Sequence, residues 1–98
     1  MIGETRRSRL TLLTRAYCHL CDEMRDALGV VATSFGAEIT ELDVDADPTL
    51  EEAFGDWVPV LLLGSVADGV RLCHYRLDHE RVAAALAADA TPPSAAPP

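Results

Sequence analysis

The chain has 98 residues, of which 49% are hydrophobic and 24% are charged, and its formal net charge at pH 7 is -8. This length and composition are typical of one small globular domain and exclude a disordered or two-domain chain. The sequence contains no lysine, so we expect no nucleic-acid partner. Its apolar runs, such as residues 58–63, are far too short to span a membrane.

The two ends of the chain differ in composition from its middle. We expect residues 1–8 to be a flexible N-terminus, residues 9–90 a folded domain, and residues 91–98, which are mostly proline and alanine, a disordered tail. The arginines near the N-terminus precede an apolar run that is too short for a signal peptide. A cytoplasmic location is therefore expected, with a monomer as the default state.

The first strand and the first helix are predicted from the spacing of apolar residues. Leu10 to Leu13 form a short apolar run, which is typical of a strand buried on both faces. From His19 onward apolar residues recur every three or four positions, which predicts a helix that ends at Gly36. We expect one side of this helix to carry Leu20, Met24, Leu28, Val31 and Phe35.

A second strand and a second helix follow. Residues 37–43 contain two apolar positions among polar ones and predict a strand. Asp47 and Pro48 then mark the start of a helix, because Asp accepts hydrogen bonds from free N–H groups and proline lacks a donor that would be unpaired there. Gly55 is expected to end this helix.

Two more strands and a last helix complete the predicted domain. Residues 59–63 and 70–75 predict an antiparallel hairpin that contains an Asp-Gly turn. Asp78 can cap a final helix, which is expected to turn Val82 and Leu86 inward and to end near Asp89. The order β-α-β-α-β-β-α predicts an α/β fold in which a four-stranded mixed sheet has helices on both faces.

The strongest chemical signal is the pair Cys18 and Cys21, a CxxC motif between a predicted strand and a helix. In that context two cysteines catalyse thiol-disulfide exchange. Cys18 would lie at the start of the helix, where free N–H groups favour its thiolate, and Cys21 one turn later is suited to resolve a mixed disulfide. Protonated His19 would also favour the thiolate and Asp22 and Glu23 would oppose it, so the sequence leaves this balance open.

Two other functions use the same motif. Cys18 and Cys21 could hold a metal ion or an iron–sulfur cluster, but a structural zinc site needs a second ligand pair. The one candidate pair is Cys73 and His74, which are adjacent on a strand and therefore point to opposite faces. No metal ligand is predicted, Cys73 is interpreted as an ordinary thiol, and His74 and His79 are expected at surface or capping positions. A thioredoxin-like scaffold that binds partners without turnover is the remaining alternative.

Residues 14–22, with Trp57-Val58-Pro59-Val60 about forty positions later, resemble the glutaredoxin-like proteins of the thioredoxin superfamily. The sequence is most similar to a small bacterial group whose site reads C-H-L-C-D, and the resemblance covers residues 9–88. It implies a thioredoxin-like (glutaredoxin-like) fold, with Cys18 as the nucleophile and Cys21 as the resolving cysteine of a redox-active disulfide.

The resemblance also implies a substrate-binding set. Val58 and Pro59, joined by a cis peptide bond, would form the platform on which a substrate chain lies. Arg15 matches the basic residue that faces the glycine carboxylate of glutathione in glutaredoxins, and Tyr17 and His19 flank the nucleophile.

The resemblance implies partners as well. The expected partners are a disulfide-containing protein or small thiol and a thiol reductant, with no bound cofactor. Glutathione is a candidate electron donor, with a thioredoxin-type system as the alternative. The Gly-Gly turn and the acidic pair that bind its γ-glutamyl end in glutaredoxins are absent here, and Asp78 is the one acid in the equivalent stretch, residues 75–78.

Overall fold

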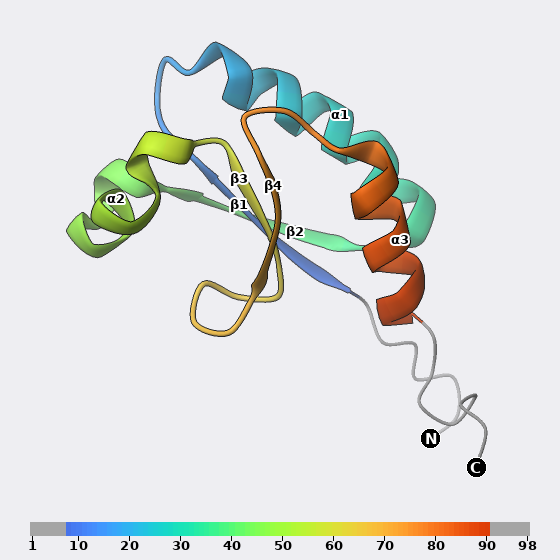
Figure 1. The fold of residues 1–98 in the computed structure, drawn as a ribbon. Coiled ribbons are helices and arrows are strands. Elements are labelled where there is room, and N and C mark those ends of the chain that lie inside the picture. Colours follow the sequence, from blue (N-terminus) through green and yellow to red (C-terminus); the bar gives the residue numbers. More distant parts are fainter. Residues whose placement is uncertain (1–7, 91–98) are drawn as a thin grey trace.

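The computed structural model of the chain describes residues 8–90 and has the order of elements predicted from the sequence (Figure 1). The predictions for residues 1–7 and 91–98 lie outside the described residues. Within residues 8–90 the elements are β1 (Arg9–Thr14), α1 (His19–Phe35), β2 (Glu38–Asp43), the 3-10 helix η1 (Val44–Ala46), α2 (Pro48–Phe54), the 3-10 helix η2 (Gly55–Trp57), β3 (Val60–Leu63), β4 (Val70–His74) and α3 (His79–Ala90).

The strands form one mixed sheet in the order β2-β1-β3-β4. β1 pairs in parallel with β2 and antiparallel with β3, and β4 pairs antiparallel with β3, as the predicted hairpin requires. In this register Leu13 lies opposite Val60, and Val60 lies opposite His74. The carboxyl ends of β1 and β4 and the amino end of β3 therefore lie at the same end of the sheet.

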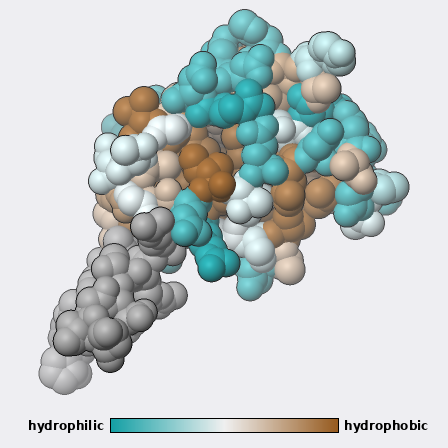
Figure 2. Space-filling view, turned by 180° about the vertical axis from the view of Figure 1, so that it is seen from behind, coloured by the Kyte–Doolittle hydropathy of each residue, from teal (hydrophilic) through white to brown (hydrophobic). Residues whose placement is uncertain are grey.

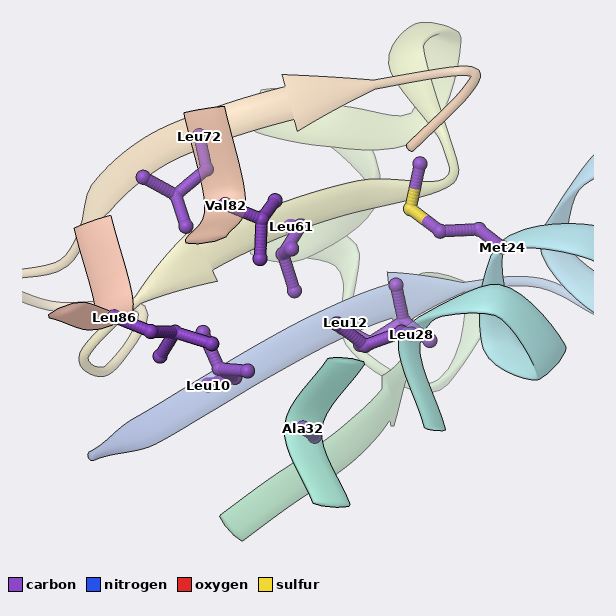
Figure 3. Close-up of a cluster of buried hydrophobic side chains, with 9 residues drawn as sticks. All are labelled: Leu10, Leu12, Met24, Leu28, Ala32, Leu61, Leu72, Val82 and Leu86. Atoms are coloured by element: carbon purple, nitrogen blue, oxygen red, sulfur yellow. The ribbon is translucent and has the colours of Figure 1, made fainter. Parts of the chain in front are cut away.

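One face of the sheet packs against α1 and α3, and Figure 3 shows the strand side chains pointing toward those of the two helices. Burying one leucine or valine in such a cluster contributes roughly 1.5–3 kcal/mol relative to leaving it exposed. The buried residues of this cluster are Leu10, Leu12, Met24, Leu28, Ala32, Leu61, Leu72, Val82 and Leu86.

The opposite face carries a smaller cluster beneath η1 and α2. Leu50 and Phe54 of α2 pack, partly buried, against the buried side chains of this cluster, and α2 has no fully buried residue. Helices therefore lie on both faces of the sheet, as predicted (Figure 1). The fully enclosed members of the second cluster are Leu13, Val44, Val60 and Leu62.

The predicted helix boundaries are confirmed by their capping contacts. Gly36 ends α1 in the left-handed conformation, with φ 67°, which glycine adopts without the steric cost that other residues meet. The carboxylate of Asp47 accepts a hydrogen bond from the Thr49 N–H at 2.9 Å. The carboxylate of Asp78 accepts one from the Arg81 N–H at 3.0 Å and so caps α3.

Three details differ from the sequence-based expectations. Phe35 is 38% exposed and Ala32 is buried instead, because Phe35 is the last residue of α1 and no further turn covers it. Gly55 ends the α-helix but keeps a right-handed conformation and begins η2. Ser8, expected in a flexible end, is buried and donates a hydrogen bond to Asp89 at 2.6 Å.

The surface that faces away in Figure 1 mixes polar and apolar residues. Seen from behind, hydrophobic residues reach the surface in separate patches with hydrophilic residues between them (Figure 2). Within residues 8–90 no helix combines the length and the apolar character that crossing a membrane requires.

Glu41 joins the edge strand β2 to its two neighbours. Its carboxylate accepts hydrogen bonds from the Arg25 Nε and Nη2 atoms of α1 at 2.8 and 2.6 Å, and from the Thr14 hydroxyl of β1 at 2.9 Å. These contacts, the hydrogen bonds from Arg25 first, hold the pKa of Glu41 below its ordinary value. The carboxylate therefore stabilises the fold above the pKa of the unfolded chain, and this contribution is lost as the pH falls through the folded-state pKa.

Replacing Glu41 with Gln tests this contact. Because the ion pair is partly exposed, Glu41→Gln should lower the thermal unfolding midpoint at pH 7 by only about 2–4 °C. The difference from the unaltered protein should narrow as the pH falls below the ordinary range of a glutamate carboxyl and through the lowered folded-state pKa, since Glu41 then becomes protonated. The control is Glu52→Gln on the exposed side of α2, which should leave the midpoint at pH 7 unchanged. A difference that stays constant through the whole acid range in which the protein remains folded would contradict the assignment.

Candidate functional site

Cys18 lies where the loop after β1 enters α1. It is the N-cap residue, with an extended backbone (φ -110°, ψ 106°), and its sulfur accepts a hydrogen bond from the Cys21 N–H at 3.1 Å. An N–H group of the first helical turn therefore points at the sulfur atom, and the positive end of the helix dipole acts on it as well. Both effects favour the thiolate form of Cys18 once the protein is reduced.

The two cysteines differ in exposure. Cys18 is partly exposed, whereas Cys21 is completely buried one turn along α1. Their Cα atoms are 5.2 Å apart and their sulfur atoms form a disulfide. An outside molecule can therefore reach Cys18, while Cys21 is placed to react with Cys18 alone.

The two carboxylates in the first turns of α1 are both paired. Asp22 Oδ1 lies 2.7 Å from Nη1 of Arg25, and Glu23 Oε2 lies 2.8 Å from Nε2 of His19. The sequence left open whether these acids would oppose a thiolate at Cys18. The geometry reduces the effect of Asp22, because Arg25 carries a positive charge beside it, and the Glu23 carboxylate is held against the His19 ring.

Pro59 lies at the same end of the sheet as the Cys18 loop. The Val58–Pro59 peptide bond is cis, as predicted, and Pro59 is buried directly before β3. The Pro59 carbonyl accepts a hydrogen bond from the Tyr75 N–H at 2.8 Å, which ties this turn to the end of β4. Val58 is partly buried, and its backbone is extended between η2 and the cis bond.

An aromatic group next to Pro59 was not predicted from the sequence. The rings of Trp57 and His74 lie 5.3 Å apart, and those of His74 and Tyr75 lie 4.7 Å apart, both edge to face. His74 is exposed, as expected, and its ring contacts these two neighbours, which the sequence did not indicate. The predicted hairpin could have indicated this aromatic group, because its register brings residues 74 and 75 beside the residues that precede β3.

Exposed aromatic side chains surround this end of the molecule. Tyr17, the residue before Cys18, is fully exposed and has a positive φ of 59°, while Trp57 is 42% and Tyr75 40% exposed. The Tyr75 hydroxyl donates a hydrogen bond to the Asp56 carbonyl at 2.8 Å, which fixes that ring against η2. Aromatic rings of this kind offer a large contact area at a small cost in conformational entropy.

Arg15 contacts acidic residues of its own chain. Its Nη2 atom lies 2.8 Å from Asp45 and 3.3 Å from Glu51, and Nη1 donates to the Gly55 carbonyl at 3.3 Å. The side-chain hydrogen bond with Asp45 is the largest cause of the raised pKa of Arg15. The predicted contact with a glutathione carboxylate would have to compete with these groups.

Cys73 takes no part in this arrangement. It lies on β4, partly buried against the larger core cluster, and burial raises the pKa of its thiol. Across residues 8–90 no three His, Cys, Asp or Glu side chains are grouped in a way that could hold a metal ion.

Known proteins share both the sequence pattern and the fold. Residues 9–87 match the family model described as "Glutaredoxin-like domain (DUF836)". The uncharacterized protein Rv0508 of Mycobacterium tuberculosis is 33% identical over 86 residues, which are 83% of this chain and 84% of that protein.

Two solved structures support the fold. Protein Ne2328 from Nitrosomonas europaea, solved by NMR, is similar with a TM-score of 0.72 and 32% identity, over 87% of this chain and 98% of that one. A mutant thioredoxin from Halobacterium salinarum has a TM-score of 0.68 at 19% identity, over 89% of this chain and 78% of that one. This second likeness establishes the thioredoxin-like fold alone. With its matching family model, its sheet topology and its Cys18–Cys21 pair, the chain belongs to the glutaredoxin-like domain family of thioredoxin-fold proteins.

Proposed function

We propose that this protein is a dithiol oxidoreductase that reduces disulfide bonds of a protein or of a low-molecular-weight thiol compound. The observation that carries the proposal is the contrast within one disulfide: Cys18 is partly exposed at the N-cap of α1, and its partner Cys21 is completely buried. This is the arrangement that a nucleophile and a resolving thiol require.

The reaction begins with both cysteines reduced. The Cys18 thiolate attacks one sulfur of the substrate disulfide, so that a Cys18–substrate bond forms while the substrate's second sulfur leaves as a thiolate and takes up a proton. Cys21, as a thiolate, then attacks the Cys18 sulfur, the mixed disulfide breaks, and the substrate's first sulfur leaves and is protonated. Two electrons pass to the substrate, and the protein retains the Cys18–Cys21 disulfide.

A second thiol compound must return the protein to its reduced form. Two equivalents of a monothiol, or one dithiol protein, supply the two electrons and are themselves oxidised to a disulfide. Glutathione and a thioredoxin-type system are the two candidate donors. We place this cycle in the cytoplasm, because thiols there are kept reduced.

Several residues around Cys18 support the binding of a substrate chain. The backbone at Val58 and Pro59 lies at the end of the sheet where an extended chain could pair with it. Tyr17 and Trp57 are exposed there and can pack on apolar side chains next to the substrate cysteine. His19 follows Cys18 in the chain and is exposed, with its ring against Glu23, so it can contact a substrate that reaches Cys18.

Serine variants of the two cysteines separate their roles. Cys21→Ser should still attack a disulfide through Cys18 and should accumulate as a mixed disulfide, detected as added mass under non-reducing conditions. Cys18→Ser should form no adduct and should lose at least about a hundredfold in the rate of disulfide reduction, since its nucleophile is gone. The control Cys73→Ser should keep the rate within about twofold, because that thiol is partly buried on β4. Full activity in Cys18→Ser would refute the proposal.

The pairing of Asp22 with Arg25 predicts how reactive Cys18 is at neutral pH. In the reduced protein, Arg25→Ala should lower the rate of Cys18 alkylation by iodoacetamide at pH 7 by about two- to fivefold, because the negative charge of Asp22, one turn along α1 from Cys18, then has no cation beside it. Asp22→Asn should raise this rate by a similar factor. Mass analysis of the alkylated peptide distinguishes Cys18 from the other two cysteines.

Glu41→Gln is the matched control for that experiment. It removes the ion pair between α1 and β2 that Arg25→Ala also removes, but it leaves the Arg25 charge in place, so alkylation of Cys18 should not slow. If Glu41→Gln and Arg25→Ala slow alkylation equally, the link between the two elements, and not the charge beside Asp22, controls the reactivity of Cys18.

A further inference from the structure

The side chain of Arg15 connects two segments that are far apart in the sequence. Arg15 directly follows β1 and precedes Cys18 by three residues. Its Nε and Nη2 atoms donate to both carboxylate oxygens of Asp45, at 3.2 and 2.8 Å. Nη2 also contacts Glu51 at 3.3 Å, and Nη1 donates to the Gly55 carbonyl at 3.3 Å.

The acceptors belong to consecutive elements on one segment. Asp45 lies in η1, Glu51 in α2, and Gly55 is the first residue of η2. This segment continues through η2 directly to the cis bond before Pro59. One guanidinium group therefore joins the loop that carries Cys18 to the segment that carries Pro59.

Local sequence supports this set of contacts. A Cβ atom added to Gly55 would lie 2.5 Å from Oε2 of Glu51, so the absence of a side chain at residue 55 makes room for the carboxylate that meets Arg15. A planar guanidinium can hold a carboxylate through two parallel bonds and still donate to other acceptors, which a lysine cannot do.

These contacts leave the guanidinium group of Arg15 with few free N–H donors for a ligand. Four of its N–H donors are used, by Asp45 twice, by Glu51 and by the Gly55 carbonyl, of the five that an arginine has. A substrate carboxylate would meet one remaining donor and the negative charges of Asp45 and Glu51. The arrangement therefore fits an internal role better than contact with an anionic substrate.

We propose that Arg15 is a positioning residue that holds the Cys18 loop at a fixed place relative to Pro59, and that it does not receive a carboxylate of the substrate. This inference rests on the proposed function, in which a substrate chain lies against Pro59 while its sulfur meets Cys18. A displacement of the reacting group by about 1 Å can lower a reaction rate by up to about a hundredfold. Fast exchange with a substrate therefore depends on holding these two segments together.

The test compares variants whose charge changes have opposite signs. Arg15→Ala removes a positive charge together with all four contacts of the guanidinium, and Asp45→Asn removes a negative charge together with the bidentate contact, so both weaken the link between the two segments. The pre-reduced protein is mixed with insulin, a protein disulfide, or with oxidised glutathione, an anionic disulfide, and its oxidation in a single turnover is timed. Dividing by the rate of Cys18 alkylation by iodoacetamide corrects for any change in the thiolate fraction, since this small reagent needs no platform.

We expect the corrected rate to fall by on the order of tenfold in both single variants and with both disulfides. The double variant should be no slower than Arg15→Ala alone, because Arg15→Ala already removes both hydrogen bonds that Asp45 makes in this link. Arg15→Lys should not restore the rate, since it keeps the charge but loses the bidentate geometry. The control Arg9→Ala, at the far end of β1, should match the unaltered protein.

Other results would overturn the inference. If Arg15→Ala slows the reaction with oxidised glutathione alone, and Asp45→Asn leaves that reaction unchanged or faster, then Arg15 binds the substrate carboxylate. If both variants react like the unaltered protein, Arg15 does not position the loop, and the proposed function stands without it. If the unaltered reduced protein does not react with either disulfide through Cys18, the proposed function fails together with this inference.

Discussion

The hydrogen bond from the Cys21 N–H to the Cys18 sulfur is the contact on which the site depends. It exists because α1 begins at His19, immediately after a cysteine whose backbone is still extended. A helix that began one residue earlier or later would turn Cys18 away from the free N–H groups or bury it. The place where α1 begins thus decides both the reactivity of one thiol and the enclosure of the other.

The register of the sheet supplies the rest of the site. Because β1 pairs antiparallel with β3, the end of β1 faces the start of β3, and Pro59 comes to lie beside the Cys18 loop. The paired strands β3 and β4 add Tyr75, whose N–H binds the Pro59 carbonyl. Arg15 joins the loop to the segment before Pro59 through its side chain. Backbone pairing between the strands and the guanidinium group of Arg15 therefore both connect the Cys18 loop with the segment around Pro59.

Most of the fold could be predicted, because each element has a local signal. Asp47-Pro48 and Asp78 mark helix starts, Gly36 marks a helix end, and alternating or continuous apolar residues mark strands. Contacts between distant side chains have no such signal. The resemblance to glutaredoxins suggested a ligand for Arg15, and nothing in the order of residues showed that Asp45 and Glu51 would reach it. Burial of Ser8 likewise depends on Asp89, at the other end of the domain.

The chain has a single tryptophan, Trp57, and it lies two residues before the cis proline with its ring partly exposed beside His74 and Tyr75. All indole fluorescence of the protein therefore originates at the rim of the dithiol site. Emission spectra of the native chain, without any label, would then report on oxidation of the nearby disulfide and on a chain that docks over it.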